Sequence, residues 1–193
     1  MRTKKGITSN RKLQIAVLGS SKAICTKKAY DIAVDIGKEI AKRGYTTITG
    51  GGLGVMEAAL KGAKEEGGLT VSILPEEHME CANKYTDVAI ATGIGFTRDS
   101  INVYSADGCI IVGGGAGTLN EATFAYIHGT PTVTVSSTGQ TAATLAKMQY
   151  LDIRKSMKII VAKTAKEAVD KVIAAIEKKR STDKNKVFPC SQG

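Results

Sequence analysis

The sequence predicts an α/β fold with a doubly wound, mostly parallel sheet and helices on both faces. Three observations support it. Short apolar runs alternate along the chain with segments of helical periodicity. Most of the predicted strands are continuous apolar runs, as a sheet covered on both faces requires. Strands that alternate with helices pair in parallel, because each helical crossover returns the chain to the same edge of the sheet.

The strands are expected where short apolar or β-branched runs are closed by glycine, proline or polar residues. In chain order these runs are 13–18, 45–49, 69–74, 87–90, 109–112, 131–135 and 158–161. The helices are expected where apolar residues recur every three or four positions between the strands. These segments are 26–43, 54–66, 98–105, 122–127, 141–148 and 164–179. Gly44 ends the first helix, and Thr164 with Glu167 forms a capping box at the start of the last.

Length and charge indicate one domain between two tails. The chain has 193 residues, 42% of them apolar, which suits a single core. We expect a domain at 13–180, a basic tail at 1–12 and a polar tail at 181–193. Residues 1–12 hold five basic residues and no acid, and residues 177–193 hold five against two acids, so most of the net charge of +9 lies at the ends. Nucleic-acid binding is therefore not expected. Binding through the tails is a weaker hypothesis that predicts a steep salt dependence.

Other classes of protein are excluded by composition. No apolar run is long enough to span a membrane, and the N-terminus has no apolar signal segment, so a cytoplasmic protein is expected. The four cysteines are scattered without a C-x-x-C pair and there are only two histidines, so no metal site is expected. We expect Cys109, which lies in a strand, to be a core residue.

Three glycine-rich or small-residue turns each follow a predicted strand. They are Gly19-Ser20-Ser21, Gly50-Gly51-Gly52 and Gly113-Gly114-Gly115, the last continuing to Gly117 and Thr118. In a parallel sheet all three lie at the carboxyl edge, where ligands bind. One such turn alone is better explained by backbone geometry than by a ligand. Three at one edge predict a shared crevice in which backbone N–H groups bind a phosphorylated small molecule.

Known nucleotide motifs are absent from these turns. The third glycine of the Gly-x-Gly-x-x-Gly fingerprint is replaced by Thr118, and no Walker lysine follows either glycine cluster. No Ser-His-Asp arrangement is present.

Glu121 and Arg98 are the candidates for chemistry. Thr118-x-x-Glu121 has the form of a helix capping box, which is a purely structural interpretation. After the glycines, the alternative is that the Glu121 carboxylate lies about a helical turn from a bound phosphate and stabilises positive charge on a sugar. Arg98 is expected in the first turn of a helix, where it opposes the helix dipole unless an anionic ligand compensates. A solvated surface arginine is the alternative. Glu57 is a weaker candidate.

Together these residues resemble the LOG-like superfamily. It includes cytokinin-activating phosphoribohydrolases (LONELY GUY), proteins labelled "possible lysine decarboxylase", and molybdenum cofactor carrier proteins. The resemblance covers about residues 13–178 and rests on Gly19-Ser20-Ser21, Gly50-Gly51-Gly52-x-Gly54-x-Met56-Glu57, Arg98, Ser105-Ala106-Asp107 and Gly113-Gly114-Gly115-x-Gly117-Thr118-x-x-Glu121.

The resemblance implies a Rossmann-like fold and a homodimer or homotetramer. In the hydrolase branch a nucleoside 5′-monophosphate is cleaved to free base and ribose 5-phosphate with no cofactor. Arg98 would then orient the substrate, Glu121 would be catalytic, and Gly113 to Thr118 would hold the phosphate. This is the leading hypothesis.

The alternative is a non-catalytic carrier of a phosphorylated ligand such as molybdenum cofactor. Hydrolases of this type typically have proline where Val112 stands, lysine at Asp99 and methionine at Asn102. The Ser105-Ala106-Asp107 sequence is also more similar to the carrier and uncharacterised branches. A decarboxylase is not supported, because no lysine has a recognisable Schiff-base signature.

Overall fold

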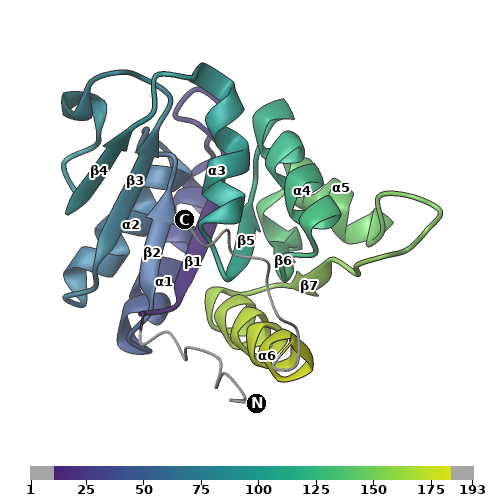
Figure 1. The fold of residues 1–193 in the computed structure, drawn as a ribbon. Helices are drawn as coiled ribbons and strands as arrows, with labels where there is room; N and C mark the ends of the chain where they lie inside the picture. Colours follow the sequence, from purple (N-terminus) through teal and green to yellow (C-terminus); the bar gives the residue numbers. More distant parts are fainter. Residues whose placement is uncertain (1–10, 184–193) are drawn as a thin grey trace, which may run out of the picture.

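A computed structural model describes residues 11–183 and has the expected α/β architecture, with a seven-stranded sheet in the order β4-β3-β2-β1-β5-β6-β7 (Figure 1). All neighbouring strands pair in parallel. The strands are β1 (Gln14–Gly19), β2 (Thr46–Thr49), β3 (Thr70–Leu74), β4 (Val88–Ala91), β5 (Gly108–Val112), β6 (Thr132–Val135) and β7 (Ile160–Ala162). The Rossmann-like fold class is therefore confirmed.

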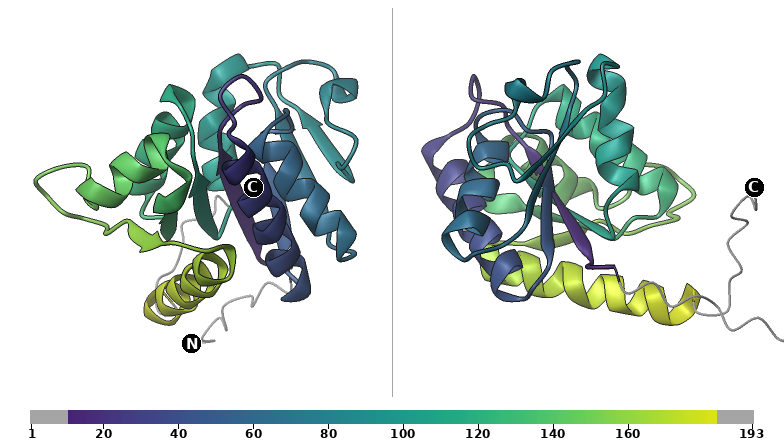
Figure 2. Two further views of the ribbon diagram at one scale, coloured as in Figure 1. Left: turned by 180° about the vertical axis from the view of Figure 1, so that it is seen from behind. Right: turned by 60° about the vertical axis from the view of Figure 1, so that its left-hand side comes forward.

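Helices cover both faces of the sheet (Figure 2). They are α1 (Lys27–Lys42), α2 (Val55–Glu65), α3 (Asp99–Tyr104), α4 (Ala116–His128), α5 (Gln140–Met148) and α6 (Ala165–Asp183). Short 3-10 turns occur at Met79–Cys81, Gly95–Arg98 and Ser136–Thr138. None of the helices within residues 11–183 is long and apolar enough to cross a bilayer.

The core consists of two layers, one on each side of the sheet. Successive side chains of a strand point to opposite faces. Ile15 and Val17 of β1 accordingly pack with α1, α2 and α6, while Ala16 and Leu18 pack with α3, α4 and α5. Cys109 of β5 is fully buried in the second layer, as expected.

Glycine allows α1 and α2 to pack closely. A Cβ atom on Gly37 of α1 would lie 1.9 Å from the Ala59 carbonyl oxygen, and one on Gly62 of α2 would lie 1.9 Å from the Val34 carbonyl oxygen. At α1, the Thr26 hydroxyl accepts a hydrogen bond from the Ala29 N–H (3.1 Å), which caps the helix. The start of α2 lies beside the turn that follows β1, because the Val55 N–H donates to the Ser20 carbonyl (2.9 Å).

Among the differences between the observed and the expected element boundaries, three concern the site or the sheet. Arg98 ends a 3-10 turn and precedes α3, so it is not in the first turn of that helix. α4 begins at Ala116, before Thr118. The strand expected at 158–161 begins only at Ile160, because the Ile159 N–H donates to the Gln149 carbonyl (2.8 Å) instead of joining the sheet.

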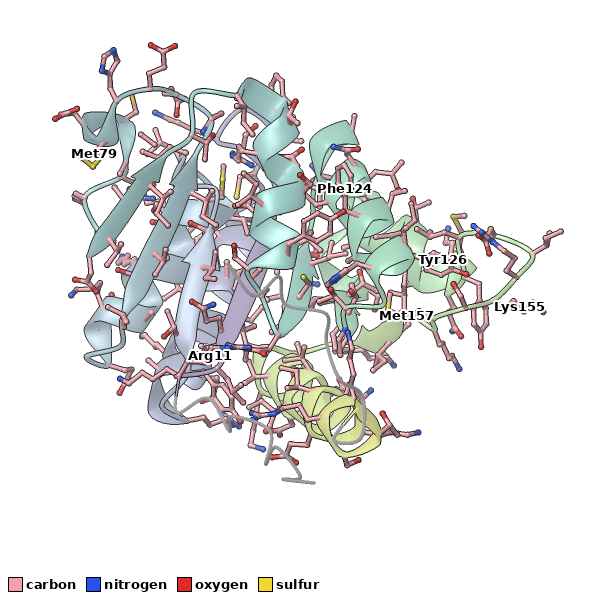
Figure 3. The ribbon with its side chains drawn as sticks, viewed as in Figure 1. Arg11, Met79, Phe124, Tyr126, Lys155 and Met157 are labelled. Atoms are coloured by element: carbon pink, nitrogen blue, oxygen red, sulfur yellow. The ribbon has the colours of Figure 1, made fainter. Side chains whose placement is uncertain are left out.

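The Ser105-Ala106-Asp107 motif lies at the amino edge of the sheet. Asp107, which precedes β5, accepts a hydrogen bond from the Gln14 N–H (2.8 Å) and pairs with Arg11 (2.5 Å). Figure 3 labels Arg11 at this end of the sheet. The Ser105-Ala106-Asp107 motif therefore joins β5 to the start of β1, at the edge opposite the glycine-rich turns. Of the expected tails, residues 1–10 and 184–193 lie outside the described residues.

Candidate functional site

A cavity of about 240 Å³ opens at the carboxyl ends of β1 and β5. The strand order reverses between these two strands, which is where doubly wound sheets bind ligands. Of the residues expected from the sequence, eight line the cavity: Gly19, Ser21, Gly50, Arg98, Gly115, Gly117, Thr118 and Glu121. Five do not line it: Ser20, Gly51, Gly52, Gly113 and Gly114.

Ser20 connects the turns around the cavity. Its hydroxyl accepts from the Gly114 N–H (2.7 Å) and donates to Gln140 Oε1 (2.7 Å), and its carbonyl accepts from the Val55 N–H (2.9 Å). The Gly113 N–H donates to Thr138 Oγ1 (2.8 Å). The N–H groups of Gly113 and Gly114 are thus engaged by buried side chains, so these two glycines shape the turn without offering donors to a ligand.

The start of α4 has backbone donors with no acceptor among residues 11–183. Gly115 is the N-cap residue, and no side chain caps the helix there. The Leu119 N–H donates to the Gly115 carbonyl (3.0 Å). The N–H groups of the three preceding helical residues, 116–118, have no acceptor within the helix. They line the cavity, and with the helix dipole they form an environment that favours an anion.

The capping-box interpretation of Thr118 and Glu121 is wrong. Both residues lie inside α4, because the flexible backbone of Gly113 (φ +60°) and Gly114 (φ +103°) lets the helix start at Ala116. The similar sequence at α6 does form a cap: the Glu167 N–H donates to Thr164 Oγ1 (3.3 Å). Glu121 is therefore free of a capping role.

The Gly50-Gly51-Gly52 turn is held by a residue that the sequence analysis missed. Asn83 is buried, and its side-chain amide donates to the carbonyls of Gly51 (2.9 Å) and Gly52 (3.1 Å). It lies in an irregular segment distant in sequence, so no local pattern indicates the contact. Gly50 itself leaves room for Arg98, because a Cβ atom there would lie 2.5 Å from Arg98 Nη2.

A buried polar cluster forms one wall of the cavity. Arg98 is only 8% exposed, so the surface-arginine interpretation is wrong. Its Nη1 donates to Asp99 Oδ1 (2.6 Å) and lies 3.9 Å from Glu121 Oε1. Asn102 Nδ2 donates to Glu121 Oε1 (3.0 Å), and Asn120 Nδ2 donates to Asp99 Oδ2 (3.2 Å). The Asp99 carboxylate thus compensates the Arg98 charge. The expectation that an anionic ligand would do so is wrong.

Two buried atoms of this cluster have no hydrogen-bond partner within the described residues. They are Arg98 Nε and Asn102 Oδ1, a donor and an acceptor. Buried polar atoms are almost always paired in proteins, and unpaired ones point to a missing ligand or water.

Burial raises the pKa of the Glu121 carboxyl to about 7. The neighbouring Asp99 charge also raises it, while the Asn102 hydrogen bond and the Arg98 charge lower it. Near neutral pH the carboxyl group is therefore present both as an acid that can donate a proton and as a carboxylate that can stabilise positive charge.

We expect Glu121 to make stability depend on pH. The pKa of the Glu121 carboxyl is higher in the folded state than the ordinary value of 4.5. Below pH 4.5 the carboxyl is protonated in both the folded and the unfolded state, so its burial carries no charge penalty. As pH rises from 4.5 towards 7, the unfolded state loses the proton first, and the free energy of unfolding falls. The loss amounts to roughly 3 kcal/mol. Urea unfolding of the wild type and Glu121→Gln at several pH values measures it, and parallel curves for the two proteins would contradict it.

Glu57 does not join the Arg98 cluster. It lines a second cavity of about 410 Å³ on the α1 and α2 side of the Ser20–Ile24 turn, with Lys22, Cys25, Tyr30 and Leu53 among its neighbours.

The Rossmann-like sheet, its glycine-rich turns at the switch point and the buried Arg98–Glu121 pair define a LOG-like protein. Residues 12–169 match the model of the SLOG cluster4 family, so the chain belongs to that family.

Two of the relatives found by sequence show the range of similarity. An uncharacterised protein of Archaeoglobus fulgidus is 45% identical over 117 residues, which cover 61% of this chain and 76% of that protein. A cytokinin riboside 5′-monophosphate phosphoribohydrolase of Mycobacterium tuberculosis is 34% identical over 102 residues, which cover 51% of this chain and 54% of the enzyme. The match thus spans about half the length of the mycobacterial enzyme.

Several solved structures match over nearly their whole length. The molybdenum cofactor binding protein of Rippkaea orientalis has a TM-score of 0.78 and 31% identity, covering 87% of this chain and 99% of that chain. The molybdenum cofactor carrier protein of Chlamydomonas reinhardtii has a TM-score of 0.72 and 36% identity, covering 87% and 98%.

Proposed function

We propose that this protein binds a phosphorylated heterocyclic small molecule in the cavity between β1 and β5 and carries it without cleaving it. A phosphorylated pterin of the molybdenum cofactor type is the proposed cargo. The ligand phosphate binds the free N–H groups at the start of α4, from Ala116 to Thr118. The heterocycle lies towards Arg98 and the apolar part of the cavity.

The observation that carries this proposal is the pairing of Arg98 with Asp99. The salt bridge is buried, with side-chain exposures of 10% and 5%, and the Arg98 guanidinium also lies against the Gly50 carbonyl. The Asp99 carboxylate neutralises the Arg98 charge, so the pair offers the cavity hydrogen-bond donors for a bound ligand rather than an unpaired cation. The similarity to a molybdenum cofactor binding protein and to a molybdenum cofactor carrier protein, over nearly the whole length of each, supports the same preference over the hydrolase hypothesis.

The experiment compares binding with turnover. Calorimetry with neopterin 3′-monophosphate, AMP and ribose 5-phosphate measures affinity, and chromatography after prolonged incubation detects free base. We expect binding of a phosphorylated ring without release of base. The carrier role would be contradicted if the protein bound none of the probes. It would also be contradicted if the protein released many equivalents of free base from AMP.

A second candidate function is the phosphoribohydrolase. It is favoured by the 3.9 Å separation of Arg98 Nη1 and Glu121 Oε1 and by the similarity to the mycobacterial enzyme. Glu121 would act as the carboxylate that stabilises the oxocarbenium-like sugar, or as the acid that protonates the departing base. If the incubations release base, Glu121→Ala must abolish the release, and full activity of that variant would exclude the mechanism. The expected homodimer or homotetramer stays a prediction, which native mass spectrometry would test.

A further inference from the structure

Phe96 places an aromatic ring in water at the cavity. It lines the cavity together with Ile24 and Met56, yet it is 82% exposed. Exposing a large apolar side chain forfeits the free energy that its burial would contribute. The Tyr104 ring, by contrast, contacts the rings of Phe124 and His128. The position of Phe96 is therefore not explained by packing within the described residues.

The backbone that carries Phe96 is anchored to its neighbours. The Gly93 N–H donates to the Glu76 carbonyl and the Gly95 N–H to the Pro75 carbonyl, both at 3.0 Å. Both glycines have positive φ angles, +64° and +58°, which other residues rarely adopt. These bonds fix the path of the chain into the 3-10 turn Gly95–Arg98, so the exposed ring belongs to a defined segment of backbone.

The same 3-10 turn supplies two different groups to one cavity. Arg98 enters the buried polar cluster, and Phe96, two residues earlier, lies at the exposed part of the lining. A cavity with polar groups, free helix N–H donors and an exposed ring suits a ligand that has a phosphate at one end and a flat ring at the other.

We propose that Phe96 is a stacking platform that selects ligands carrying a planar fused heterocycle. The inference rests on the proposed function, because it requires a phosphorylated ligand in this cavity. Stacking of a flat ring on Phe96 buries apolar surface on both partners and tolerates different heterocycles, because every such ring has a π-face. A nucleobase and a pterin share this chemistry.

The test compares phosphorylated ligands with and without a ring. Calorimetry gives the affinities of AMP, neopterin 3′-monophosphate and ribose 5-phosphate for the wild type and Phe96→Ala. We expect Phe96→Ala to weaken binding of at least one ring-bearing ligand by roughly tenfold to a hundredfold. Ribose 5-phosphate should bind equally well to both proteins. The two ring-bearing ligands show whether the ring is a nucleobase or a pterin. Ile153→Ala is the matched control, because Ile153 is 97% exposed and does not line the cavity.

A spectroscopic variant tests contact directly. The chain contains six tyrosines but no tryptophan, so Phe96→Trp places the only tryptophan at the platform, and its emission can be excited separately from that of tyrosine. We expect the ring-bearing ligand that binds in calorimetry to quench its emission and ribose 5-phosphate to leave it unchanged, whereas the same ring-bearing ligand should not affect Ile153→Trp.

The possible outcomes separate the two proposals. Unchanged affinities in Phe96→Ala, or equal losses for ring-bearing and ring-free ligands, would overturn the platform while leaving the phosphate site intact. If the wild type binds none of the three ligands, both the platform and the proposed function are overturned.

Discussion

Gly114→Asp is expected to abolish binding of the phosphorylated probes, with affinity falling by more than about a hundredfold. A Cβ atom on Gly114 would lie 2.5 Å from Thr118 Cβ, and the backbone has a φ of +103° that an L side chain rarely adopts. Thr118 belongs to the first turn of α4, so relief of the clash must displace the N–H groups that are proposed to bind phosphate. The new carboxylate would also repel the anion.

The same substitution is expected to destabilise the fold by about 2 kcal/mol or more, from backbone strain and the clash. Gly129→Ala is the matched control at the other end of α4, because Gly129 has a similar φ of +72° but no atom within 4 Å of its Cβ position. It should cost about 1 kcal/mol and leave binding unchanged. Calorimetry and thermal unfolding measure both effects, and unaltered binding in folded Gly114→Asp would exclude the start of α4 as the ligand site.

Arg98→Met is expected to destabilise the protein by about 3–5 kcal/mol, because it leaves buried acids without a cation. Asp99 would lose its 2.6 Å partner, and the pKa of Glu121 would rise further, since the Arg98 charge lowers it. Adding Asp99→Asn should recover part of the loss, because the double variant no longer buries the unpaired Asp99 charge.

Arg43→Met provides the comparison. Arg43 also contacts two carboxylates, Glu39 and Asp170, but its side chain is 25% exposed and water solvates the acids that remain. Its loss should cost within about 1 kcal/mol. Denaturant unfolding gives the stability of the wild type, of the three single variants Arg98→Met, Asp99→Asn and Arg43→Met, and of the double variant. Equal losses of unfolding free energy in Arg98→Met and Arg43→Met would show that burial does not set the contribution of the Arg98–Asp99 pair to stability. Additive effects of Arg98→Met and Asp99→Asn would show the same.

Local patterns predicted the fold well, because each strand and helix is encoded in nearby residues. The apolar run that becomes β5 and the helical spacing that becomes α1 are visible without any partner. Parallel pairing then brings Gly19, Gly50 and Gly115 to one edge, so the place of the cavity also follows from the order of the elements.

The interpretation of individual side chains was less successful, because it depends on contacts between distant segments. Arg98 next to Asp99 in sequence gives no sign that both are buried. Asn102 and Glu121 lie on different helices, and their hydrogen bond forms only when α3 packs beside α4. Asn83 donates a hydrogen bond to the carbonyl of Gly51, which lies 32 residues earlier in the chain.

The sequence by itself determined the parallel α/β fold, the three turns at one edge and the resemblance to LOG-like proteins, because glycine patterns and apolar periodicity are local properties. Only the tertiary structure decided what each residue of those turns does. It assigns the N–H groups of Gly113 and Gly114 to Thr138, Ser20 and Gln140, and leaves free those that follow at the start of α4. The physical reason is that a backbone donor binds whichever acceptor the fold brings within about 3 Å, and that choice is made by segments far away in the chain.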